Sequence, residues 1–267
     1  MAKNLSIVLV TRNSKSVIFD CLKALENNDS ITSSKNAQWI MVDNDSKDGS
    51  IEEVIKLYPD INLIKNNYNA GFAKAANQGF NAAESEFILY INTDTEITKN
   101  SISKLYKTIV SDNKIAVIGP RLLRKNNTIQ KSVYPEATLW TEIFKPLIKL
   151  YVSVRENFYK PGKCYTVNSL RGACFIINKQ YMQNVGCFDE RYFFYLEETD
   201  LFRQLKLSGK QICYLPESEV YHYGGLGSDD KMNFDKKKMY NNSLLKYFGK
   251  NRNKFENFII GKIIKNK

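Results

Sequence analysis

Three carboxylates lie close together in the stretch YFFYLEETDLFRQLKLSG, residues 192–209. Glu197, Glu198 and Asp200 stand there between an aromatic run and an amphipathic pattern, in a chain with 39 basic and only 28 acidic side chains. Carboxylates so close raise one another's pKa and cost stability. Two interpretations follow: acids that complement the dipole at a helix N-terminus, or an active-site cluster that accepts a proton.

Polar side chains also follow the apolar runs LSIVLVT, WIMV and FILYI. Thr11 and Asn13 end the first run, Asp43 the second, and Asn92 and Asp94 the third. In open α/β sheets, ligands bind beyond the carboxyl ends of the strands. Asp43 is placed to accept hydrogen bonds from a ribose or a base, and Asp94 to hold Mg²⁺ or Mn²⁺ together with a diphosphate. The alternative for these residues is turn and helix-cap chemistry.

The stretch NYNAGFAKAANQGF, residues 67–80, is rich in small residues at the start of a predicted helix. Helix N-termini favour phosphates, but the stretch is neither GxGxxG nor a Walker loop. Taken alone, it favours tight packing of a helix on a sheet.

Strands and helices alternate in the first half of the chain, which predicts an α/β fold with a mostly parallel sheet flanked by helices. The second half is less regular, and residues 134–160, with many aromatics, lysines and prolines, predict an insertion or a mobile segment. Further along, we expect a strand over 169–177, a helix over 197–207 and a strand over 211–215. The expected strands are 5–11, 39–42, 61–64, 87–91 and 115–118, and the expected helices run to about 25, from about 50, and over 72–83 and 101–110.

Composition narrows the class of protein. Of the 267 residues 43% are hydrophobic, which is enough for a real core, and no apolar run approaches a membrane span. The single histidine, His222, excludes paired-histidine zinc sites. Widely spaced cysteines that we expect to be reduced, and the lack of a signal peptide, favour a cytoplasmic protein. The net charge of +11 favours an anionic partner.

Several of these stretches together resemble a known family. VDNDSKDGS, NAGFAKAANQG, NTD, LRGACFII, VGCFDERYFFYLEETDLFRQL and YHYGG, in this order, resemble the family-2 glycosyltransferases with the GT-A fold, and within them the rhamnosyltransferase-like branch. The resemblance runs from about residue 5 to residue 228. It implies an inverting enzyme of the hexosyltransferase type that moves a sugar from a nucleotide donor to an acceptor hydroxyl.

The resemblance also implies roles for single residues. Asp94 would take the metal-binding place of a DxD-type motif, although Asn92 stands where the first acid would be, and His222 would lie near the metal and the diphosphate. The remaining positions, together with Asn92, would hold the nucleotide sugar: Thr11, Asn13, Asp43, Asn69, Gly71 and Asn77 at the nucleoside, and Arg171, Gly172 and Ala173 at the donor sugar and the acceptor.

The acidic stretch acquires a role in the same way. EETD matches the family's ED-x-D segment, and Glu198 stands where the base is usually an aspartate. Inverting transfer needs a base that takes the acceptor's proton. We therefore expect Glu198 to be the base, with Asp200 as second choice and Glu197 beside it.

The predicted organisation is a GT-A domain over 1–230, with a nucleotide-binding half (1–118) and an acceptor half (119–230), and a basic amphipathic tail over 231–267. The tail predicts an interfacial helix on an anionic membrane, or else apolar residues that pack on the domain. The expected function is synthesis of a cell-surface polysaccharide from a dTDP- or UDP-sugar and a glycan or lipid-linked acceptor, with Mg²⁺ or Mn²⁺ and without nucleic acid. The alternatives are a nucleotidyltransferase that makes sugar nucleotides and a basic nucleic-acid-binding protein.

Overall fold

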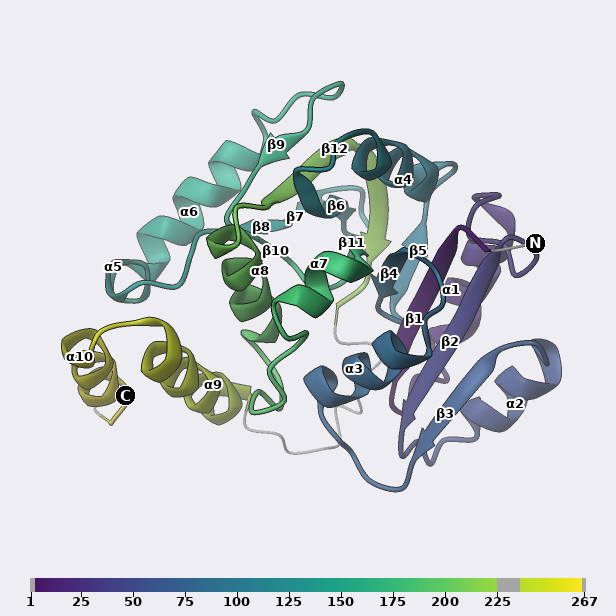
Figure 1. The fold of residues 1–267 in the computed structure, drawn as a ribbon, viewed down its shortest axis with the longest axis horizontal. Helices are drawn as coiled ribbons and strands as arrows, with labels where there is room; N and C mark the ends of the chain where they lie inside the picture. The colour runs from purple at the N-terminus through teal and green to yellow at the C-terminus, as the bar shows by residue number, and fades with distance from the viewer. Residues whose placement is uncertain (1–2, 225–235, 266–267) are drawn as a thin grey trace.

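The first half of the chain forms the alternating strands and helices that its apolar runs predict (Figure 1). The computed structural model describes residues 3–224 and 236–265. β1 pairs in parallel with both β2 and β4, and β2 with β3. The elements are β1 (Leu5–Thr11), α1 (Ile18–Asn27), β2 (Ala37–Asn44), α2 (Ser50–Leu57), β3 (Asn62–Asn66), α3 (Phe72–Ala82), β4 (Phe87–Ile91), β5 (Thr95–Ile97) and α4 (Ser101–Ser111).

Strands from the second half complete the same sheet, in the order β3-β2-β1-β4-β11-β6-β12-β5. These are β6 (Ile115–Leu123), β11 (Cys174–Asn178) and β12 (Gln211–His222). β11 is antiparallel to both β4 and β6, and β12 is parallel to β6. The carboxyl ends of β1, β2, β4 and β12 and the amino end of β11 therefore meet at one edge of the sheet, where ligands bind in such folds.

Two expectations for the second half were wrong. The predicted strand over 169–177 is divided into β10 (Ser169–Leu170), which pairs with β8 (Val133–Tyr134), and β11. The predicted irregular segment contains α5 (Leu139–Ile143) and α6 (Lys145–Glu156). α5 begins with a capping box in which Thr138 and Thr141 exchange side-chain and backbone hydrogen bonds. The other elements here are β7 (Ile129–Gln130), β9 (Tyr165–Thr166), α7 (Lys179–Asn184) and α8 (Glu197–Leu207).

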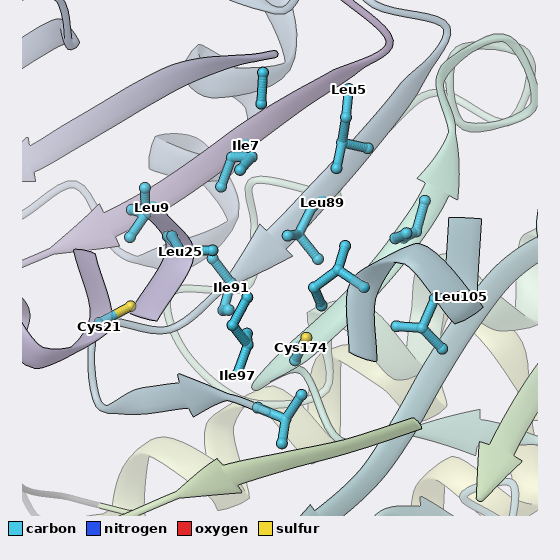
Figure 2. Packing of buried hydrophobic residues seen from close by; sticks show 14 of the residues in the cluster. Leu5, Ile7, Leu9, Cys21, Leu25, Leu89, Ile91, Ile97, Leu105 and Cys174 are labelled. Carbon is cyan, nitrogen blue, oxygen red and sulfur yellow. The ribbon is translucent and has the colours of Figure 1, made fainter. Parts of the chain in front are cut away.

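The core lies on both faces of the sheet, because side chains alternate along each strand. Leu5, Ile7 and Leu9 of β1 point to one face, where they meet α1 and α4 (Figure 2). Val8 points to the other face, against α3. A Cβ on Gly79 of α3 would lie 2.3 Å from a Val8 methyl carbon, so small residues let α3 pack tightly on the sheet.

The C-terminal region forms α9 (Lys236–Asn251) and α10 (Lys254–Lys265). Residues 231–235 of the predicted tail lie outside the described residues. Leu244, Tyr247 and Phe248 of α9 and Ile260 of α10 are buried in a third cluster with Ala137 and Tyr192. The apolar face of α9 therefore packs on the domain, which agrees with the alternative prediction that the apolar residues of the tail are part of the core. Among the described residues, no helix is long and apolar enough to cross a membrane.

Candidate active site

A cavity of about 1320 Å³ opens at the edge of the sheet where the strand ends meet. Both halves of the chain line it. Of the residues that the sequence predicts for the site, those in the lining are Thr11, Asn69, Gly71, Asn92, Asp94, Arg171, Gly172, Ala173, Glu197, Glu198 and His222. The structure thus brings together residues that are up to 211 positions apart in the chain.

Glu198, in the first turn of α8, points its carboxylate at the turn between β10 and β11. The backbone amide of Gly172 donates a hydrogen bond to it. A Cβ on Gly172 would lie 1.9 Å from Glu198 Oε1, so any side chain at residue 172 would displace the carboxylate. Gly172 therefore fixes the position of Glu198 in the cavity wall.

The environment of Glu198 suits a proton acceptor. Burial raises the pKa of Glu198, whereas its own amide, the charge of Arg171 and the Gly172 amide act in the opposite direction. Arg171 is held by hydrogen bonds to the Lys131 carbonyl, at 2.8 Å, and to the Tyr134 hydroxyl. The result is a half-buried carboxylate that is more basic than an exposed glutamate.

Glu197 differs from its neighbour although it also lines the cavity. Its side chain is buried, and Oε2 has no hydrogen-bond partner among the described residues. Burial and the nearby charge of Glu198 raise the pKa of Glu197 well above its ordinary value. Both effects favour the neutral acid form of Glu197, which makes it a weaker candidate for the base than Glu198.

Asp200, the second choice for the base, does not line the cavity. Its side chain is 2% exposed, and it accepts hydrogen bonds from Lys250 Nζ and Asn251 Nδ2 of α9, both at 2.7 Å. Asp200 thus joins α8 to α9 through a buried ion pair, and its place in the structure is that of a packing residue. Arg203, one turn further along α8, pairs with Glu136.

Lys250→Met is expected to lower the free energy of unfolding by about 2–3 kcal/mol, because it leaves the buried Asp200 charge without its cation. The matched control is Lys254→Met, which removes an exposed lysine from α10. Urea denaturation followed by circular dichroism measures both. Equal stability of the two variants would show that the ion pair does not hold α9.

Asp94 and His222 meet at the other side of the cavity. His222 Nε2 lies 3.4 Å from Asp94 Oδ1, and both side chains are nearly buried. Gln130 Nε2 donates to the His222 carbonyl at 3.3 Å, which turns Gln130 Oε1 toward the ring, 2.7 Å from Nδ1. With Nδ1–H donating to Gln130 Oε1, the Nε2 lone pair would face the Asp94 carboxylate, which is the arrangement that a cation bound between them needs.

This donor set fits a divalent cation. A carboxylate oxygen and an imidazole nitrogen that face each other are both electron-pair donors, and the Gln130 contact orients the ring as outer partners of metal ligands do. Among residues 3–224 and 236–265, no group of three or more His, Cys, Asp or Glu side chains could hold a metal. A cation here would therefore take its remaining ligands from water and from a bound diphosphate, which Mg²⁺ does readily.

The side of the cavity that is predicted to hold the nucleotide lies at the ends of β1, β2 and β4. Thr11 is buried there, and its hydroxyl has no hydrogen-bond partner among the described residues. Asn69 Oδ1 accepts from the Gly71 amide at 3.1 Å, and the amide of Asn92 donates to the Ala173 carbonyl at 2.9 Å. The Thr11 hydroxyl is thus available to a ligand, and Asn92 links the two halves.

Three residues predicted for the nucleotide lie outside the lining. Asn13 Oδ1 accepts from the Lys47 amide at 2.7 Å, and Asp43 Oδ1 accepts from the Ser46 amide at 3.1 Å, so both order the loop after β2. Asn77 makes a two-way bond with the backbone of Phe188. The structure uses these three side chains for loop geometry and does not bring them to the cavity, so their contact with nucleotide stays a prediction.

The segment before α8 is tied to the nucleotide half. The Phe72 amide at the start of α3 donates to the Phe193 carbonyl at 2.9 Å, and a Cβ on Gly71 would lie 2.6 Å from that oxygen. Tyr195 and Leu196 have φ of 73° and 68°, which is uncommon for such residues. Two strained residues directly before the Glu198 turn are typical of a functional site.

Sequence reasoning missed a group of cations in the wall. Lys131, Lys145 and Lys149 line the cavity on the α6 side. Burial lowers the pKa of Lys131, and the charges of Arg171, Lys149 and Lys145 lower it further. The signal was present only as lysines in a segment predicted to be irregular, and their convergence depends on α6, which the sequence analysis did not find.

The fold and the cavity define a GT-A glycosyltransferase. A model of the family described as Glycosyl transferase family 2 matches residues 6–182, and the chain belongs to this family. The match ends before α8, so it covers the nucleotide half and the turn at Gly172 but not Glu198.

Similar proteins are glycosyltransferases, and one of them is named for a lipid-linked sugar. The chain is 26% identical to an N-acetylglucosaminyl-diphospho-decaprenol L-rhamnosyltransferase of Mycobacterium tuberculosis over 216 residues, which cover 73% of this chain and 69% of that enzyme. It is 28% identical to a low-salt glycan biosynthesis hexosyltransferase of Haloferax volcanii over 206 residues, 75% of this chain and 61% of the other. Among solved structures, GalNAc-T7 with UDP, GalNAc and Mn²⁺ has the same fold, with a TM-score of 0.65 and 20% identity, over 83% of this chain and 44% of that one.

Proposed function

We propose that this chain is an inverting glycosyltransferase that moves a sugar from a nucleoside diphosphate to a hydroxyl group of a lipid-linked glycan. The observation that carries the proposal is the position of Glu198: a basic, half-buried carboxylate, fixed by Gly172, in the same cavity as the Asp94–His222 pair. A base for the acceptor and a place for the leaving group are the two requirements of a single displacement.

In the proposed reaction, the acceptor hydroxyl loses its proton to a Glu198 oxygen as its own oxygen forms a bond to the anomeric carbon. The bond between that carbon and the diphosphate oxygen breaks on the opposite face of the sugar, which inverts the configuration. The diphosphate leaves with the electron pair. Glu198 must therefore lie on the acceptor side of the sugar.

Asp94 and His222 would hold the divalent cation, which neutralises charge on the leaving diphosphate when it is bound. GalNAc-T7, which has the same fold, was crystallised with Mn²⁺. Thr11, Asn69 and Asn92 would contact the donor, and Arg171 would lie at its sugar end. The buried Thr11 hydroxyl without a partner among the described residues supports this assignment.

The chemistry of the relatives guides the choice of substrates. The mycobacterial relative is named for transfer of L-rhamnose to a diphospho-decaprenol-linked sugar. A dTDP-linked rhamnose is thus the first donor to test here, with UDP-sugars next, and a polyprenyl-diphosphate sugar is the first acceptor. Synthesis of a cell-surface polysaccharide is the setting in which both would meet.

The test is a screen of nucleotide sugars for thermal protection and for slow hydrolysis, with and without Mn²⁺ or Mg²⁺. One donor should raise the melting temperature in the presence of the cation and should be hydrolysed to its nucleoside diphosphate. Protection by nucleoside triphosphates and sugar phosphates, with release of pyrophosphate, would indicate a nucleotidyltransferase and contradict the proposal. The absence of protection by every donor would contradict it as well.

A further inference from the structure

A continuous row of large apolar side chains on α5 and α6 faces solvent. Their spacing of three or four residues is that of one helix face, which in a globular domain normally packs on the core. Here the opposite face of α6 packs on the protein, with Val152 and Glu156 buried. The exposed fractions are Trp140 68%, Ile143 45%, Phe144 44%, Leu147 65%, Leu150 64%, Tyr151 59%, Val154 48% and Phe158 73%.

α10 contacts α5 at the same end of the molecule (Figure 1) and also carries exposed aromatic side chains. Phe255 and Phe258 of α10 are 67% and 58% exposed. Contiguous exposed apolar surface of this kind marks an interaction site. This surface lies mainly on α5 and α6, outside the C-terminal tail for which the sequence predicts an interfacial helix.

The charges around the row favour a negatively charged partner. The exposed charged side chains from residue 140 to residue 163 are all cations: Lys145, Lys149, Arg155, Lys160 and Lys163. The two acids of this segment are engaged elsewhere. Glu142 bonds Lys145 and the Tyr240 hydroxyl, and Glu156 accepts the Ser132 and Val133 amides.

Large apolar side chains flanked by lysines suit the interface of an anionic bilayer, where the apolar groups enter the headgroup boundary and the cations meet phosphates. A second copy of the chain suits the surface less well, because it would bring two sets of these cations together. We propose that α5 and α6 form the surface by which the enzyme lies on an anionic membrane.

The position of α6 gives this surface a use in the reaction. The side of α6 next to the row lines the cavity with Lys145, Ile148 and Lys149. If the acceptor is lipid-linked, as the proposed function has it, it would pass from the bilayer along α6. Its diphosphate would meet Lys145 and Lys149, and its sugar would enter the cavity.

The test is co-sedimentation of the full chain with vesicles of phosphatidylglycerol and phosphatidylcholine, compared with phosphatidylcholine alone. Leu147→Glu/Leu150→Glu should lower the partition coefficient at least about tenfold. The matched control is Leu57→Glu/Leu207→Glu, which changes two leucines of similar exposure, 57% and 66%, on α2 and α8; it should bind like the wild type. Binding of the wild type should weaken with salt and on neutral vesicles.

Equal vesicle binding by both double variants and the wild type would overturn the inference, as would a failure of the wild type to bind anionic vesicles. Sedimentation velocity without lipid tests the alternative that a second copy of the chain binds this surface. A wild-type dimer that Leu147→Glu/Leu150→Glu dissociates would assign the row to self-association and overturn the inference. Donor hydrolysis in lipid-free buffer should be equal in the wild type and both variants. If no donor is hydrolysed, the proposed function fails, while the vesicle result still decides the surface.

Discussion

Replacement of Glu198 by glutamine is expected to slow sugar transfer by about 10²–10⁴-fold and to leave donor affinity nearly unchanged. Glutamine keeps the shape of the side chain and its contact with the Gly172 amide, but it cannot take the acceptor's proton. Initial rates with saturating donor measure the loss, and the thermal shift produced by the donor measures binding.

Two neighbouring acids serve as controls for this variant. Glu197→Gln should retain most of the activity, since burial favours the neutral form of Glu197 and glutamine is close in shape to a protonated glutamate. Asp200→Asn should lower the free energy of unfolding, because Asp200 pairs with Lys250, while the folded variant should keep most of its transfer rate. Near-full activity in Glu198→Gln together with an inactive, folded Asp200→Asn would assign the base to Asp200 instead.

The pH dependence of the rate follows from the same carboxylate. A base works only when it is deprotonated, so the rate is full above its pKa and falls as the pH drops through it. Burial raises the pKa of Glu198, which moves this fall to higher pH than an exposed glutamate would give. Arg171→Met should move it higher still, because the guanidinium charge lowers the pKa of Glu198.

Asp94→Ala is expected to weaken cation-dependent donor binding at least about 100-fold, and His222→Ala should act in the same direction. Both variants remove one of two electron-pair donors that face each other at 3.4 Å. Titration of Mn²⁺ and donor, followed by the change in melting temperature, separates loss of the cation from loss of the protein fold.

The control for the metal site is Glu96→Gln, which changes a carboxylate two residues further along that bonds the Tyr223 hydroxyl and lies outside the cavity lining. It should bind the cation and donor like the wild type. Full activity of the wild type in excess EDTA would remove the metal from the proposal. Direct contacts from lysine or arginine would then have to stabilise the diphosphate.

The sequence predicts the nucleotide half well because its signals are local. A buried parallel strand is a short apolar run, and the polar residue at its end belongs to the edge where ligands bind, so Thr11, Asn92 and Asp94 could be placed in advance. The resemblance to a known family supplied Glu198. The structure places it in the cavity wall, but its role as base stays a prediction.

Local patterns could not show where a side chain has a distant partner. Asp200 has the same chemistry as Glu198 and differs only in facing Lys250, fifty residues further along the chain. The Asn77 side chain forms two hydrogen bonds with the Phe188 backbone, and no local sequence pattern predicts that contact. Likewise, α6 was missed because its apolar face is turned to solvent, and pattern reasoning assumes that such a face lies on the core.

The ion pair between α8 and α9 also bears on how the chain folds as it is synthesised. The strands and helices up to β4 find their partners early, since their contacts lie within a continuous N-terminal stretch, and such units tend to fold first on the ribosome. The buried Asp200 charge on the helix that carries Glu198 lacks its counterpart until Lys250 and Asn251 have emerged, so we expect that helix to become stable late. Placement of Glu198, the proposed base, in the cavity wall would then be one of the last events in the maturation of the nascent chain.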